Sequence, residues 1–155
     1  MTRILFYTYF LLAIAVFEAI IGLSLQSLGA LIAYNLLLLA ASIAAGLVYS
    51  TRYSGRARVA GLLLLAVSAV KAASLVYDLP VVADAVVDMV LVIVLVSSVA
   101  LLRGGRVALL AVVFAVTGSV LVFLKLDPYT LVGGLILEAG AAFLAAGHLR
   151  PVNSG

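Results

Sequence analysis

The chain has 155 residues, of which 67% are hydrophobic and only 10% are charged. An ordinary soluble domain is about 45–50% apolar and about a quarter charged, so this chain has too few polar residues to cover a surface in water. The composition excludes a soluble globular domain and predicts an integral membrane protein. Because a membrane-spanning helix takes roughly 20 residues, six spans would use nearly the whole chain.

Six long apolar runs are separated by short segments rich in turn residues and charges. Helices are expected in these runs, because backbone groups in lipid need internal hydrogen-bond partners and the runs lack the polar alternation of a membrane β-barrel. The predicted fold is all-α, a polytopic bundle of six transmembrane helices that forms a single transmembrane domain over residues 1–155. The expected spans are Ile4–Leu25, Leu31–Tyr49, Val59–Val76, Val81–Leu102, Val107–Leu124 and Tyr129–His148.

Basic residues indicate the orientation. All seven arginines fall in the N-terminus, the second and fourth loops, and the C-terminus, which an even number of spans places on one side of the membrane. The opposite loops hold Lys125 against Asp78 and Asp127. Because basic loops stay in the cytoplasm, we expect both termini to be cytoplasmic in a multi-pass protein of the cell membrane. The arginines are Arg3, Arg52, Arg56, Arg58, Arg103, Arg106 and Arg150.

The formal net charge of +3 does not predict a nucleic-acid partner. The basic residues lie in short loops between spans and form no stripe on a soluble face. We therefore interpret the charge as a topology signal. The expected partners are the lipid bilayer and either further copies of this chain or other membrane-protein subunits.

Five ionisable residues lie within the apolar runs. A charged side chain at the bilayer centre costs roughly 2.5–3.5 kcal/mol on insertion scales, so such residues usually face a bundle interior or a watery cavity. At 1.5 Å per residue, most of them are about 10 Å below the same end of their spans, and the opposite half of the membrane carries none. The five are Glu18, Lys71, Asp84, Asp88 and Glu138.

Glycine spacing supports close helix packing beside two of these carboxyl groups. Gly22 follows Glu18 by one turn, and Gly134 precedes Glu138 by one turn. Small residues let a neighbouring helix approach closely. One interpretation is therefore structural: Lys71 pairs with one or two carboxylates, the other carboxyl groups are protonated, and the layer holds helices together.

Charge counting favours a second interpretation. Four carboxyl groups oppose Lys71 alone, so full ionisation would leave three uncompensated negative charges in a medium of low dielectric constant. The carboxyl groups must take up protons, bind cations or contact water. We assign Glu18 and Glu138 as deeper exchangeable carboxyl groups, Asp84 and Asp88 as an outer attracting pair, and Lys71 as an internal counter-ion.

Catalysis and cofactor binding have little support. The chain has no cysteine, and the single His148 cannot form a bis-histidine haem site within one chain, so no cofactor is expected. Asp84 and Asp88 have the Asp-x-x-x-Asp spacing with which some membrane prenyltransferases and CDP-alcohol phosphotransferases hold a divalent metal. Pro80 stands where the phosphotransferase pattern has a glycine, and the Asp-rich first half of that pattern is missing. We predict no metal site, and the sequence does not favour an enzyme.

The sequence thus predicts a small membrane protein for proton- or cation-linked transport, a transporter or channel, through the charged layer in the outer half of the membrane. The alternative is a non-catalytic membrane subunit that docks to a larger membrane complex and stabilises it. Short loops and short tails fit this alternative as well.

Overall fold

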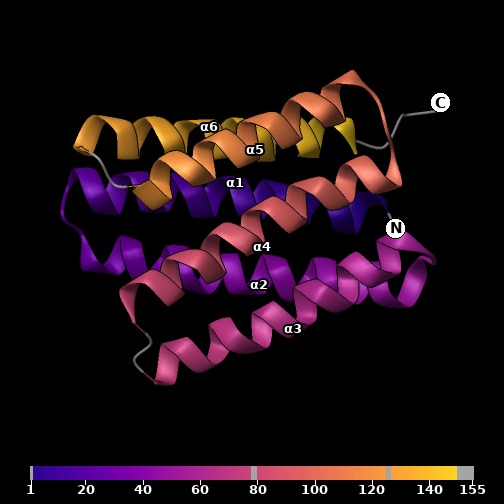
Figure 1. Cartoon of the computed structure of the whole chain (residues 1–155), viewed down its shortest axis with the longest axis horizontal. Helices are drawn as coiled ribbons and strands as arrows, with labels where there is room; N and C mark the ends of the chain where they lie inside the picture. The colour runs from indigo at the N-terminus through magenta and orange to yellow at the C-terminus, as the bar shows by residue number, and fades with distance from the viewer. Residues whose placement is uncertain (1, 78–79, 125–126, 150–155) are drawn as a thin grey trace.

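In the part of the chain that it describes, residues 2–77, 80–124 and 127–149, the computed structural model consists of six α-helices joined by short turns (Figure 1). All six are long and apolar enough to cross a membrane, which confirms the predicted all-α bundle of membrane-length helices. The helices are α1 (Thr2–Ser24), α2 (Leu28–Arg52), α3 (Arg56–Val76), α4 (Val81–Leu102), α5 (Arg106–Leu124) and α6 (Pro128–His148).

Local capping residues explain where two of the helices begin. Ser27 Oγ accepts a hydrogen bond of 3.3 Å from the backbone N–H of Ala30 at the start of α2. Asp127 Oδ1 accepts one of 2.7 Å from the N–H of Thr130 at the start of α6, where proline occupies the first turn. Serine, aspartate and an early proline are the residues that favour a helix start.

The largest differences from the expected spans, three residues each, lie at the start of α2, which begins at Leu28 and not Leu31, and around the turn at residues 53–55. There α2 continues to Arg52 and α3 already begins at Arg56, whereas the sequence predicted a loop from Ser50 to Arg58. Arginine is a good helix former, and at a helix end its long side chain reaches the interface. The helices therefore extend beyond the apolar runs, although no helix end differs from its expected position by more than three residues.

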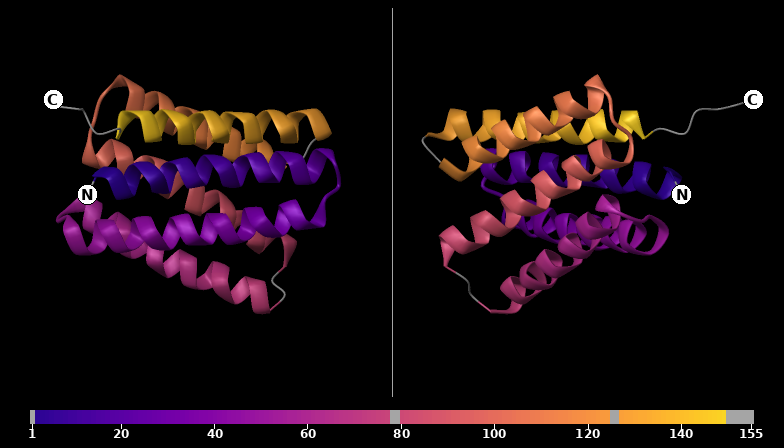
Figure 2. Two further views of the ribbon diagram at one scale, coloured as in Figure 1. Left: turned by 180° about the vertical axis from the view of Figure 1, so that it is seen from behind. Right: turned by 45° about the vertical axis from the view of Figure 1, so that its right-hand side comes forward.

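The helices form a closed ring in chain order, because each packs against the next and α6 returns to α1. In Figures 1 and 2, α4 crosses the bundle obliquely, and it also contacts α2 and α6. The third helix lies at one edge of the bundle, between α2 and α4. Short turns suffice because helices adjacent in sequence are adjacent in space.

The bundle has two chemically different ends. The start of α1, the end of α6 and the turns at residues 53–55 and 103–105 lie at one end (Figure 2), which we call the arginine end. The other end, where α4 and α6 begin, is called the acidic end. Arg150, Lys125 and Asp78, which the sequence analysis used as topology signals, lie outside the described residues. The described residues at the arginine end include Arg3, Arg52, Arg56, Arg58, Arg103 and Arg106.

Two hydrogen-bonded tyrosines connect three helices in the half of the bundle toward the arginine end. The hydroxyl oxygens of Tyr9 and Tyr49 are 2.8 Å apart, and the Tyr9 hydroxyl donates to the carbonyl oxygen of Leu95. Because the single Tyr9 proton goes to Leu95, Tyr49 is the donor in the tyrosine pair. Both tyrosines are fully buried, so the link joins α1, α2 and α4 inside the core.

Large apolar side chains cover the outside of the bundle. Tyr7 on α1, Leu36 on α2, Val59 on α3 and Leu109 on α5 are all more than half exposed. Soluble proteins rarely expose contiguous apolar surface on this scale. Together with the six apolar helices, this surface indicates a multi-pass membrane protein.

Candidate functional site: an acidic cavity inside the bundle

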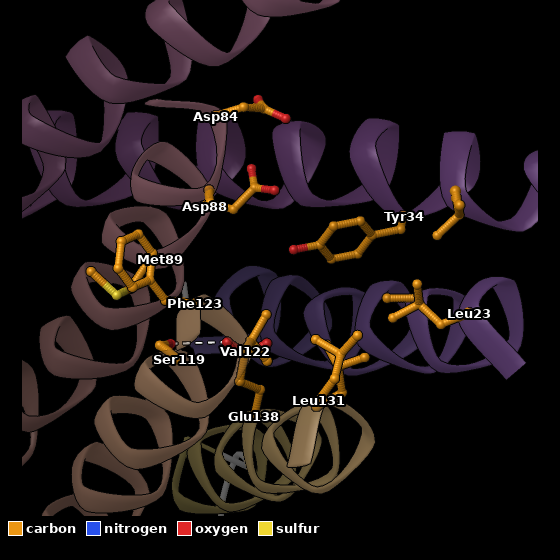
Figure 3. A pocket seen from close by; sticks show the side chains of 14 residues that line it. Leu23, Tyr34, Asp84, Asp88, Met89, Ser119, Val122, Phe123, Leu131 and Glu138 are labelled. Carbon is orange, nitrogen blue, oxygen red and sulfur yellow. Dashed lines mark hydrogen bonds between the residues drawn. The ribbon is translucent and has the colours of Figure 1, made fainter. Parts of the chain in front are cut away.

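A cavity of about 280 Å³ lies inside the half of the bundle toward the acidic end (Figure 3). Five helices contribute to its wall, and only α3 does not. Most of the wall is apolar, with leucines from α1, α2 and α6. The polar residues that line the cavity are Tyr34, Asp84, Asp88, Ser119 and Glu138.

The cavity brings together three of the four carboxyl residues that the sequence placed in one layer. Asp84 and Asp88 are one turn apart on α4, and Glu138 reaches the same space from α6. Side-chain exposure is 44% for Asp84 and 21% for Asp88, and Glu138 is only 3% exposed. The exposure of the three carboxyl residues thus decreases from Asp84 at the mouth of the cavity to Glu138 in its interior.

Lys71 is a buried cation held by two neighbouring helices. Its Nζ donates to Asp88 Oδ1 on α4 at 2.6 Å and to Asn35 Oδ1 on α2 at 2.7 Å, while Asp84 Oδ1 is 3.8 Å away. The side chain is only 1% exposed. A buried charge is tolerated when it is paired and hydrogen-bonded, as Lys71 is here.

Glu138 is positioned by a close approach of α5 and α6. A Cβ atom added to Gly118 would lie 2.5 Å from the carbonyl oxygen of Gly134, and one added to Gly134 would lie 2.7 Å from that of Gly118. Only glycine permits this contact. Glu138 lies one turn after Gly134 on α6, and its Oε1 accepts a 2.9 Å hydrogen bond from Oγ of Ser119 on α5.

Glu18 is separate from this group. It is half-buried on α1 and is not among the residues that line the cavity, although its neighbour Ala19 is. Among the described residues, no hydrogen bond or ion pair involves Glu18. The close packing predicted beside it is present, since a Cβ atom on Gly22 would lie 2.7 Å from Leu31 Cδ2 of α2.

Two polar residues of the cavity were not identified from the sequence. Tyr34 directs its hydroxyl group into the cavity toward Asp88 in Figure 3, and Ser119 supports Glu138. Asn35, which accepts a hydrogen bond from Lys71, was not identified from the sequence either. The one available signal was the polar pair Tyr34-Asn35 inside an otherwise apolar run.

The charges of the site are unbalanced. Three carboxyl groups and one ammonium group give two excess negative charges if every group is ionised. Ionised carboxylates are strongly disfavoured in an apolar wall, so the excess charge requires protons, bound cations or contact with water. In the described residues, no cluster of three or more histidine, cysteine, aspartate or glutamate side chains is arranged to hold a metal ion.

No family model, no curated protein and no solved structure matches the chain.

Proposed function

We propose that the acidic cavity is the binding site of a proton- or cation-linked transporter or channel. The observation that carries the proposal is Glu138, a nearly fully buried carboxyl group that lines the same cavity as Asp84 and Asp88. A carboxyl group in that position is stable when neutral or when a cation accompanies it. Uptake and release of a proton or cation at Glu138 is therefore the chemistry that this site supports best.

The graded exposure supports different roles for the carboxyl groups. Asp84, the most exposed, attracts cations to the mouth of the cavity. Asp88 is held by Lys71, so its charge is largely compensated. Glu138 is the exchangeable group at the inner end, and Ser119 fixes its position. Glu18 stays a predicted exchangeable group, with a smaller role because it does not line the cavity.

The same proposal includes the orientation and the surroundings of the protein. The arginine end faces the cytoplasm, both termini are cytoplasmic, and the cavity opens toward the outside of a cell membrane. The apolar outer surface contacts lipid and is available for further copies of the chain or for other membrane subunits.

Flux measurements in proteoliposomes test the proposal. The purified protein is reconstituted into liposomes that contain a pH-sensitive dye, and a potassium diffusion potential drives the proton flux. Sodium or potassium gradients drive the cation flux in parallel experiments. We expect flux above that of protein-free liposomes and at least a tenfold decrease in Glu138→Gln. Glutamine keeps the shape of the side chain and accepts the Ser119 hydrogen bond, but it cannot exchange a proton.

Asp127→Asn is the matched control, because it changes a carboxyl group at the same end that lies outside the cavity. It should leave the flux unchanged, and Glu18→Gln should reduce it less than Glu138→Gln does. Wild-type protein that carries neither protons nor any cation in the panel would overturn the proposal. If such protein also purifies only together with other membrane proteins, the non-catalytic subunit is favoured instead.

A further inference from the structure

A second concave site lies between α3 and α4 in the half of the bundle toward the arginine end. This groove has a volume of about 640 Å³, and Val59, Leu63, Ile93, Val94 and Leu101 form its apolar walls. Val59, Leu63 and Leu101 are between 46% and 67% exposed, so the groove opens to the outside of the bundle. In a membrane that outside is lipid, and an apolar groove of this kind is filled by hydrocarbon rather than water.

One end of the groove is positively charged. Arg56, the first residue of α3, lines it together with Gly55, the residue that precedes the helix. No side chain caps this helix start. The free backbone N–H groups and the helix dipole therefore add to the guanidinium charge at the same point. An arginine beside an open helix N-terminus is well suited to bind a phosphate group.

The rest of the groove contains nothing that opposes an anion. The described residues that line it include no carboxylate. Of its two serines, Ser98 uses its hydroxyl proton within α4, where it donates to the carbonyl oxygen of Val94 at 2.6 Å. Arg52 and Arg58 lie on either side of Arg56 in sequence and add to the positive potential at this end. The groove is thus apolar along its walls and cationic at the level where lipid headgroups lie.

We propose that this groove binds one anionic phospholipid from the leaflet at the arginine end. The phosphate group contacts Arg56 and the start of α3, and an acyl chain lies between α3 and α4, which run side by side in Figure 1. A zwitterionic lipid offers the same chain, but its cationic headgroup is repelled by the arginines. This site is separate from the acidic cavity and does not depend on the proposed transport.

Native mass spectrometry of the full chain in detergent tests the proposal. Phosphatidylglycerol and phosphatidylcholine with identical acyl chains are added in equal amounts. We expect at least tenfold preference for one bound phosphatidylglycerol. Arg56→Gln should abolish this preference, and Leu63→Trp, which fills the groove without changing charge, should weaken binding at least fivefold. The matched control is Arg106→Gln, which changes the first residue of α5 at the same end but outside the groove and should retain the preference.

Three outcomes would overturn the proposal. Equal binding of the two lipids would show that charge does not select the ligand. Equal losses in Arg56→Gln and Arg106→Gln would show that binding follows the overall charge of the arginine end. Full binding by Leu63→Trp, together with competition by inorganic phosphate, would show an anion site without a chain site. A thermal unfolding curve for each variant verifies that the bundle is folded.

Discussion

Among single residues, variants of the hydrogen-bonded pair Ser119 and Glu138 can distinguish an effect on stability from an effect on function. Ser119→Ala leaves a buried carboxyl oxygen without its partner, whereas Glu138→Gln keeps an acceptor in place. Interhelical hydrogen bonds in membranes contribute about 0.6–2 kcal/mol. We therefore expect Ser119→Ala to lower the free energy of unfolding by about 1 kcal/mol and Glu138→Gln to change it less. Thermal unfolding in detergent measures both, and a greater loss in Glu138→Gln would contradict the assignment.

The Lys71 ion pair gives a larger effect. Lys71→Met removes the counter-ion from a carboxylate that is mostly buried, which costs about 3 kcal/mol in comparable cases. Lys71→Met combined with Asp88→Asn should recover most of that stability, because the more buried carboxylate is then neutral and Asp84, the other partner of Lys71, is 44% exposed. The same cycle with Glu18→Gln in place of Asp88→Asn is the control. It should show no coupling energy, since no contact joins Glu18 to Lys71.

At the scale of helices, two neighbouring glycines on α6 have opposite surroundings. Gly134 meets the backbone of α5, whereas a Cβ atom on Gly133 would have nothing within 4 Å. Gly134→Ala must push α5 and α6 apart, at a cost of about 1–3 kcal/mol, and should weaken the Ser119–Glu138 bond. Gly133→Ala should be neutral or slightly stabilising. Unfolding curves of the two variants compare them directly, and equal stabilities would show that the close approach does not hold α5 to α6.

The stability of the first turn of α6 should depend on pH. The backbone N–H of Thr130, and then its hydroxyl, donate to Asp127 and hold the pKa of that carboxyl below its usual value of 3.8. Because the pKa is lower in the folded chain, the contribution of this cap is complete above about pH 4 and is lost as the pH falls through the folded value. The protection of the amide hydrogens in the first turn of α6, measured as the exchange rate relative to the unfolded chain at the same pH, should fall below pH 4. In Asp127→Asn that loss of protection should be absent, and its persistence would contradict the assignment.

At the scale of the whole molecule, the absence of cysteine permits a direct test of orientation. Ser54→Cys lies in the turn between α2 and α3 at the arginine end, and Gly29→Cys lies in the first turn of α2 at the acidic end. Both positions are exposed. In intact cells, an impermeant maleimide should label Gly29→Cys and not Ser54→Cys. The reverse pattern would place the acidic cavity on the cytoplasmic side.

The overall architecture was predictable because composition and arginine placement depend on the membrane rather than on packing. Apolar runs and loop arginines specified six spans and one arginine end. Which residues of each helix face the neighbouring helices and the cavity was not predictable to the same degree. Successive helix residues point about 100° apart, so a small rotation of α1 decides that Ala19 and not Glu18 lines the cavity. Tyr34 and Ser119 were missed because such residues are common in membrane helices and become informative only when a neighbour is known.

The position of Glu138 has an electrical consequence. It is the eleventh residue of α6, and roughly 10–15 Å of helix separate it from the acidic end, a third to a half of a bilayer about 30 Å thick. A full membrane crossing changes the energy of one elementary charge by about 2.3 kcal/mol per 100 mV, so a charge that reaches Glu138 experiences roughly 1 kcal/mol of it. With the acidic end outside, a negative interior draws cations inward, and occupancy of the cavity should rise with membrane voltage.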